Sequence, residues 1–217
     1  AMRRVLLLVC SASSLFGQPE PPLRDRVTMY LTDLIRLDTT NPPGNETRVA
    51  EYLKRVADAH GIPAELIGPD RNRLNFVARL KGTGKQKPLL LMAHSDVVPA
   101  DRTQWSVDPF AAVVKNGTMY GRGTEDVKSL LAAELAILVE LKNRGTKLDR
   151  DIILLSAVSL LLALQDLDYR GPAIVLEDAG TALQRDHFPQ DIAVHVLRKP
   201  LEMQRVFRAV AHALESG

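Results

Sequence analysis

The run Leu89-Leu90-Leu91-Met92-Ala93 is the strongest indication of fold in this sequence, and His94-Ser95-Asp96 follows it directly. Consecutive apolar residues of this kind are typical of a strand that is covered on both faces. Side chains at the carboxyl end of such a strand open into the crevice where α/β proteins bind ligands. The stretch therefore predicts a buried strand with His94 and Asp96 at a ligand-binding edge.

Helical and strand patterns alternate on both sides of this strand. Apolar residues at helical spacing predict three helices, which cover about 27–35, 45–57 and 124–143, the last one capped by Thr124. Further strands are predicted at 75–80 and 151–156, and Asn116-Gly117 predicts a hairpin between 111–115 and 118–120. Strands that alternate with helices of this length indicate an α/β fold, here a mixed sheet flanked by helices.

Composition and charge narrow the classes of function. The chain has 217 residues, of which 46% are hydrophobic and 25% charged, and its formal net charge is +2. These values are ordinary for a globular protein and exclude collagen-like, coiled-coil and wholly disordered chains. A nearly balanced charge gives no support for a nucleic-acid partner. No apolar run reaches the about 18 residues that span a bilayer, so stable membrane insertion is not expected.

The first 17 residues predict a secretory signal peptide. Arg3 and Arg4 are the only charged residues there, and they precede the apolar run Val5-Leu6-Leu7-Leu8-Val9-Cys10. Cleavage would export the protein to the periplasm or the medium, whereas an uncleaved chain would stay cytoplasmic. The alternative for this segment is a buried first strand. Cys10 is the single cysteine, so no internal disulfide is expected.

Two groups of residues suit metal chemistry. A neutral His94 is a good zinc ligand, and Asp96 can accept its second ring proton and thereby fix the tautomer. In Gly121-Arg122-Gly123-Thr124-Glu125-Asp126-Val127-Lys128, a carboxylate at the start of a helix could bridge two cations. The alternatives are a satisfied histidine in a turn, and acidic residues that are favoured by the helix dipole without any metal.

Four motifs in order closely resemble the zinc metallopeptidase family of glutamate carboxypeptidase, aminoacylase, carnosine dipeptidase and succinyl-diaminopimelate desuccinylase. They are Asp38-Thr39-Thr40-Asn41-Pro42-Pro43-Gly44, His94-Ser95-Asp96-Val97-Val98-Pro99, Trp105-Ser106-Val107-Asp108-Pro109-Phe110 and the motif from Gly121 to Lys128. The resemblance extends over about residues 23–156. It implies a two-zinc amide hydrolase in which His94 binds one zinc, Asp126 bridges both, and Asp96 has a catalytic role in orienting His94.

The resemblance weakens after residue 156. In the family two adjacent glutamates, the general base and a zinc ligand, follow the strand at 151–156, but here Leu160 and Leu161 occupy those places. The resemblance resumes at Asp178, which fits another zinc ligand, with Glu177 as the alternative. A substitute base would be Glu177 or Glu125. The late histidines His187, His195 and His212 are expected to be structural or solvated.

The sequence therefore predicts a signal peptide at 1–17, a metallopeptidase-like portion at 18–156 and a divergent tail at 157–217 that completes the same domain. This would be a shortened catalytic domain without the family's lid and dimerisation domain. The expected function is zinc-dependent hydrolysis of amide bonds in small peptides or N-acylated amino acids, with one or two zinc ions. The alternatives are a catalytically silent metal-binding or scaffold protein and, because Lys199-Pro200 follows a predicted strand, a receiver-like phosphoacceptor module.

Overall fold

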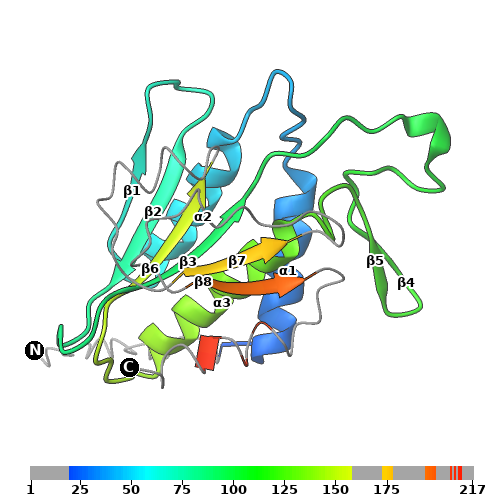
Figure 1. Cartoon of the computed structure of the whole chain (residues 1–217). Helices are drawn as coiled ribbons and strands as arrows, with labels where there is room; N and C mark the ends of the chain where they lie inside the picture. The colour runs from blue at the N-terminus through cyan, green and yellow to red at the C-terminus, as the bar shows by residue number, and fades with distance from the viewer. Residues whose placement is uncertain are drawn as a thin grey trace, which may run out of the picture.

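The computed structural model describes residues 20–157, 173–177 and 194–198, together with residues 206, 208, 210 and 211 of a helical segment (Figure 1). Several of the predictions fall on other residues. The signal peptide at 1–17, the Leu160-Leu161 stretch, the ligand Asp178, the Lys199-Pro200 motif and the histidines His187 and His212 all lie outside the described residues.

The two N-terminal helices form where the apolar spacing predicts them. Helix α1 covers Leu23–Arg36 and helix α2 covers Thr47–Ala59. Helix α1 buries Val27, Leu34 and Ile35 along one stripe, and it ends before Asn41-Pro42-Pro43, where proline removes backbone donors. Its first turn carries an acidic residue and its last turn a basic one, as the helix dipole favours.

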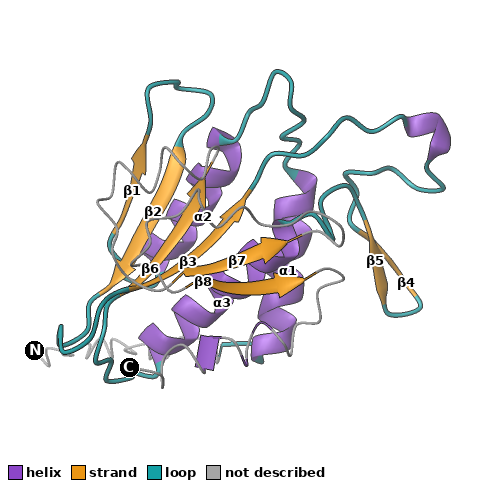
Figure 2. Ribbon diagram, viewed as in Figure 1, coloured by secondary structure: helices purple, strands orange, loops and turns teal. Residues whose placement is uncertain are grey.

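Six strands form one mixed sheet in the order β1-β2-β6-β3-β7-β8. The pairs β1–β2 and β2–β6 are antiparallel, whereas β6–β3, β3–β7 and β7–β8 are parallel (Figure 2). Their bounds are Ala64–Ile67, Asn75–Leu80, Leu89–His94, Ile152–Ala157, Ala173–Glu177 and Val194–Arg198 for β1, β2, β3, β6, β7 and β8. Helix α3, Lys128–Asn143, connects the parallel neighbours β3 and β6, so β6 lies between β2 and β3.

The apolar core lies between one face of this sheet and the helices. Helix α2 contacts β1 and β2, while α3 contacts β3 and β6 and also packs against α1. Leu89 and Leu91 belong to this core cluster, which Val206 and Val210 of the C-terminal helical segment join. Leu90 and Met92 point to the opposite face and are buried as well. The expectation that β3 is covered on both faces is therefore confirmed.

Three details differ from the sequence-based expectations or extend them. Strand β1 was not predicted; three of its four residues are partly buried, and Glu65 is exposed. Helix α3 begins at Lys128 instead of Thr124, whose hydroxyl donates to the Gly121 carbonyl in a preceding turn. A short 3₁₀ helix, η1, covers Arg102–Gln104.

The predicted hairpin consists of β4, Val113–Lys115, and β5, Thr118–Tyr120, which form a small separate sheet. Asn116 and Gly117 both have positive φ, as a tight hairpin turn requires. In the described portion of the chain, no helix is long and apolar enough to cross a membrane.

Candidate metal site at the carboxyl end of β3

The predicted histidine is the last residue of β3, where the buried strand reaches the edge of the sheet. His94 is partly exposed, with 43% of its side-chain surface accessible. Its Nδ1 lies 3.1 Å from Asp96 Oδ1 and 3.2 Å from the Asp96 carbonyl oxygen. Both oxygens are acceptors, so Nδ1 donates to them when it carries a proton, and a ring held in this way can bind a ligand through Nε2.

The other nitrogen of the ring faces Asp126. His94 Nε2 lies 3.1 Å from Asp126 Oδ1, although 32 residues separate the two in the sequence. The sequence predicted Asp126 in the first turn of a helix, but it lies in the turn that precedes α3. Of its side-chain surface, 55% is accessible. The structure therefore brings together His94, Asp96 and Asp126, with the imidazole between two carboxylates.

Close backbone packing places the Asp126 turn. Gly123 has a φ of +90°, and a Cβ there would lie 2.9 Å from Val97 Cγ1 and 3.2 Å from Lys128 Cδ. A Cβ at Gly121 would lie 2.6 Å from Ile35 Cγ2. The glycines of this motif are thus required because the turn presses against both β3's extension and α1.

The charges in this cluster shift each other's ionisation. Burial lowers the pKa of His94, but hydrogen bonds to Asp126 and Asp96 outweigh it and raise the pKa to about 9. The same hydrogen bond with His94, reinforced by one from Asn41, holds the pKa of Asp96 below its ordinary value against the effect of burial. In the metal-free protein both ring nitrogens therefore carry a proton at neutral pH, and a metal ion would have to displace the one on Nε2.

A third segment, residues 38–41, supports the site from the side. Thr39 Oγ1 donates to the Ser95 carbonyl at 2.5 Å, and the Asn41 backbone N–H donates to the Val97 carbonyl at 2.8 Å. The Asn41 side-chain amide then donates to Asp96 Oδ2 at 3.0 Å. Asn41 had no predicted role. Its only signal was its position in the first of the four motifs.

Lys128 is a second residue without a predicted role. It is fully buried, and its Nζ donates to the carbonyls of Leu34 and Leu37 at 3.0 and 2.7 Å. Burial lowers the pKa of Lys128 to about 8, despite the opposing charges of Asp38 and Asp96. Lys128 therefore ties the end of α1, and with it the start of the 38–41 segment, to the start of α3.

The donors present suit a metal ion in part. Zinc binds imidazole nitrogen and carboxylate oxygen at about 2.0–2.2 Å, and two ligand atoms of one ion are then about 3 Å apart. The separation of 3.1 Å between His94 Nε2 and Asp126 Oδ1 fits that requirement. Within the described ranges, however, no group of three or more His, Cys, Asp or Glu side chains could hold a metal ion. Asp178 lies outside the described residues, and Glu125 is exposed next to Asp126.

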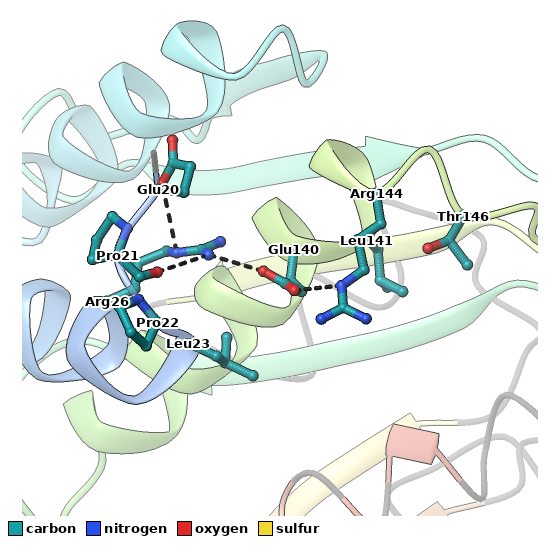
Figure 3. Close-up of a pocket in the computed structure, with 9 residues that line it drawn as sticks. All are labelled: Glu20, Pro21, Pro22, Leu23, Arg26, Glu140, Leu141, Arg144 and Thr146. Carbon is teal, nitrogen blue, oxygen red and sulfur yellow. Dashed lines mark hydrogen bonds and ion pairs between the residues drawn. The ribbon is translucent and has the colours of Figure 1, made fainter. Parts of the chain in front are cut away.

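A cavity of about 620 Å³ lies elsewhere, between the start of α1 and the end of α3 (Figure 3). Arg26 and Glu140 form an ion pair across it at 2.8 Å, and Arg144 bonds the second carboxylate oxygen at 2.5 Å. His94 and Asp126 lie at the opposite end of α3, so this cavity is separate from the candidate metal site.

Known proteins match the same part of the chain. Residues 90–159 match the family model for Peptidase family M20/M25/M40. A probable succinyl-diaminopimelate desuccinylase from Staphylococcus aureus (strain MRSA252) is 38% identical over 117 residues, which are 53% of this chain and 28% of that protein. The chain therefore spans much less than the full length of the curated relatives it matches.

Solved structures show the same fold. The M20 family metallo-carboxypeptidase from Sulfolobus solfataricus has a TM-score of 0.60 and 24% identity, over 71% of this chain and 38% of that one. A dinuclear metal-binding peptidase of the M20 family from Bacillus subtilis has a TM-score of 0.52 and 16% identity, over 72% of this chain and 44% of that one. These likenesses confirm the mixed α/β fold. The match to the model of peptidase family M20/M25/M40 covers residues 90–159, which include the end of β3, the turn before α3 and strand β6.

Proposed function

We propose that this chain provides the metal-binding part of a zinc-dependent hydrolase, which cleaves amide bonds in small peptides or N-acylated amino acids. The observation that carries the proposal is the placement of His94 between Asp96 and Asp126. The matched family is one of peptidases, and a desuccinylase removes an acyl group from an amine, so both substrate types are amides. The Bacillus subtilis neighbour is a dinuclear metal-binding peptidase, which supports a metal-dependent function for this chain.

In this proposal His94 Nε2 and Asp126 hold the zinc, and Asp178 adds a further ligand. A bound zinc ion would polarise the scissile carbonyl and acidify a water molecule. Asp96 accepts the Nδ1 proton of His94, so the ring keeps one orientation and its other nitrogen stays free to bind. The turn before α3 fixes Asp126 from the opposite side of the ring.

The general base is the second part of the proposal. The β3–β7 register pairs Leu91 with Ile174, and Glu177 follows Ile174 at the same interval at which His94 follows Leu91. Parallel strands end at one edge of a sheet, so the backbone of Glu177 reaches the edge that carries His94. This placement favours Glu177 over the exposed Glu125 as the substitute base.

Metal analysis tests the site. The intact protein should bind one or two zinc ions, and His94→Ala should lower that number because it removes a ligand nitrogen. His60→Ala is the matched control, since His60 lies at the end of α2 and contacts Asn143 there. Zinc-free protein after exposure to zinc, or an unchanged number in His94→Ala, would exclude the site.

Activity is tested separately on a panel of dipeptides and N-acylamino acids with zinc-loaded protein. Turnover that Glu177→Gln abolishes and Glu125→Gln preserves would support the assignment of the base. A protein that binds zinc but hydrolyses nothing in the panel would instead be the catalytically silent metal-binding protein.

Export is also proposed, from the charge and apolar pattern of residues 1–17. Fractionation of expressing cells, followed by N-terminal sequencing, should find a shortened chain in the periplasm or medium. A full-length chain confined to the cytoplasm would contradict the signal peptide.

A further inference from the structure

We propose that Asn41 is a positioning residue of the candidate metal site, which acts through Asp96 on the orientation of His94. The inference concerns the site described under the proposed function and rests on it for its functional meaning. Its structural content is a chain of side chains, from Asn41 to Asp96 to His94 to Asp126, contributed by three separate segments.

The first step is that the two oxygens of the Asp96 carboxylate have different partners. Oδ1 lies 3.1 Å from His94 Nδ1, and Oδ2 accepts a hydrogen bond of 3.0 Å from Asn41 Nδ2. A carboxylate group whose two oxygens have different partners cannot rotate about its Cβ–Cγ bond without losing one of them. Asn41 therefore holds the plane of the carboxylate on which the His94 ring rests.

The second step is that Asn41 is itself held in place. Its backbone N–H donates to the Val97 carbonyl at 2.8 Å, and Thr40 forms a parallel bridge with Val97. On the other side of Asn41, the Gly44 N–H donates to the Thr40 carbonyl at 2.9 Å. The Asn41 amide thus starts from a backbone that is fastened to the extension of β3, the strand that carries His94.

The third step is the consequence for His94. A carboxylate that keeps its orientation accepts the Nδ1 proton, and in the neutral ring this favours the tautomer whose Nε2 can bind a metal ion. The Asp126 carboxylate, 3.1 Å from Nε2, favours the other tautomer, so the orientation of Asp96 affects the balance between the two. Without Asn41, Asp96 Oδ2 would lose that protein donor and the carboxylate could turn. The ring would then populate the second tautomer, in which the nitrogen next to Asp126 carries the proton and cannot bind a metal ion.

The test compares Asn41→Ala and Asn41→Leu with the parent protein. Leucine keeps the branched shape of the side chain and removes the amide, so comparison with alanine separates the hydrogen bond from packing. Asn143→Ala is the matched control, because Asn143 also contacts a histidine from another segment, at 3.3 Å from His60 Nδ1, and lies at the far end of α3.

The first readout is ¹⁵N NMR of the histidine rings in metal-free protein, at a pH where the rings are neutral, with the His94 signals assigned from His94→Gln. The parent and Asn143→Ala should show the same proportion of the Nδ1–H form of His94. Both Asn41 variants should show a smaller proportion of it, because the Asp96 carboxylate is then less well oriented to accept that proton. An unchanged proportion in both folded variants would overturn the proposal, whatever their stability.

The second readout is zinc affinity by competition with a chromophoric chelator. Loss of a group that orients a metal ligand typically weakens binding by about 10–100-fold, and an effect relayed through Asp96 should lie near about tenfold. A lower melting temperature with unchanged affinity and tautomer would mean that Asn41 is only structural. If the parent binds no zinc, the proposed function fails, while the NMR result still decides the role of Asn41.

Discussion

Glu134 is an ionisable residue in the apolar core, and its effect on the pH dependence of stability can be measured. It lies on α3 among apolar residues and is fully buried. Among the described residues, neither of its carboxyl oxygens has a hydrogen-bond partner of good geometry. Burial raises the pKa of Glu134 well above its ordinary value, and the Met92 backbone offsets this only in part. The folded protein therefore holds the Glu134 proton more tightly than the unfolded chain does.

The sign of the pH effect follows from this raised pKa. Above about pH 4.5 the unfolded chain releases the proton while the folded chain keeps it, so the unfolded state is favoured. While the folded chain keeps the proton that the unfolded chain has released, each pH unit lowers the free energy of unfolding by about 1.4 kcal/mol. Glu134→Gln removes the ionisation and should flatten this slope.

Urea denaturation at pH 5, 6 and 7 in the presence of a chelator measures the slope. The stability of Glu134→Gln relative to the parent should rise from pH 5 to pH 7, by at most about 1.4 kcal/mol per pH unit. Glu134→Leu should also be more stable at pH 7 because the site is apolar. Glu51→Gln, on the exposed side of α2, should leave the slope unchanged. If Glu134→Gln shows the same dependence of stability on pH as the parent, the raised pKa of Glu134 is refuted.

Three further predictions concern other parts of the structure. Arg26→Met should lower the free energy of unfolding by about 2–3 kcal/mol, because it removes one partner of an ion pair in which Arg26 is only 3% exposed. Lys54→Met removes a partner from an exposed ion pair and should cost less than about 0.5 kcal/mol in the same urea titration. Gly123→Ala should lower the free energy of unfolding by more than the about 1–2 kcal/mol that a left-handed conformation costs, because the added Cβ would contact Val97 and Lys128. Gly84 also has a positive φ but open space around it, so Gly84→Ala should lose only about 1–2 kcal/mol. Equal losses in the two variants would exclude an effect of crowding. Because the pKa of Lys128 is lowered in the folded protein, the unfolded chain holds an extra proton between pH 8 and pH 10, and this residue makes the free energy of unfolding rise over that interval. Lys128→Met should remove this rise, which thermal melts at pH 8 and pH 10 can measure.

Local sequence patterns gave most of the elements because their signals are carried by neighbouring residues. The apolar run 89–93 became the buried core of β3, and Asn116-Gly117 became the turn of the β4–β5 hairpin. Strand β1 escaped prediction because its four residues, Ala64–Ile67, lie at the edge of the sheet and show no clear alternation of burial.

The start of α3 shows where local signals mislead. Thr124 and the acidic residues after it have the composition of a helix start, but tertiary contacts hold 122–127 as turns. Gly123 must fit against Val97, and the Lys128 backbone N–H returns to the Gly123 carbonyl at 2.9 Å. The turn that results is what brings Asp126 to His94.

The sequence by itself determined the helices, the buried strand and the residue types at its end, because periodicity and motif composition depend on residues close together in the chain. It also pointed to the peptidase family through four short motifs. Only the tertiary structure decided that β6 lies between β2 and β3, that Asp126 reaches His94, and that Asn41 reaches Asp96 across 55 residues. These contacts arise from the packing of α1 against α3 and of α3 against the sheet, and no pattern of nearby residues encodes the distance between such segments.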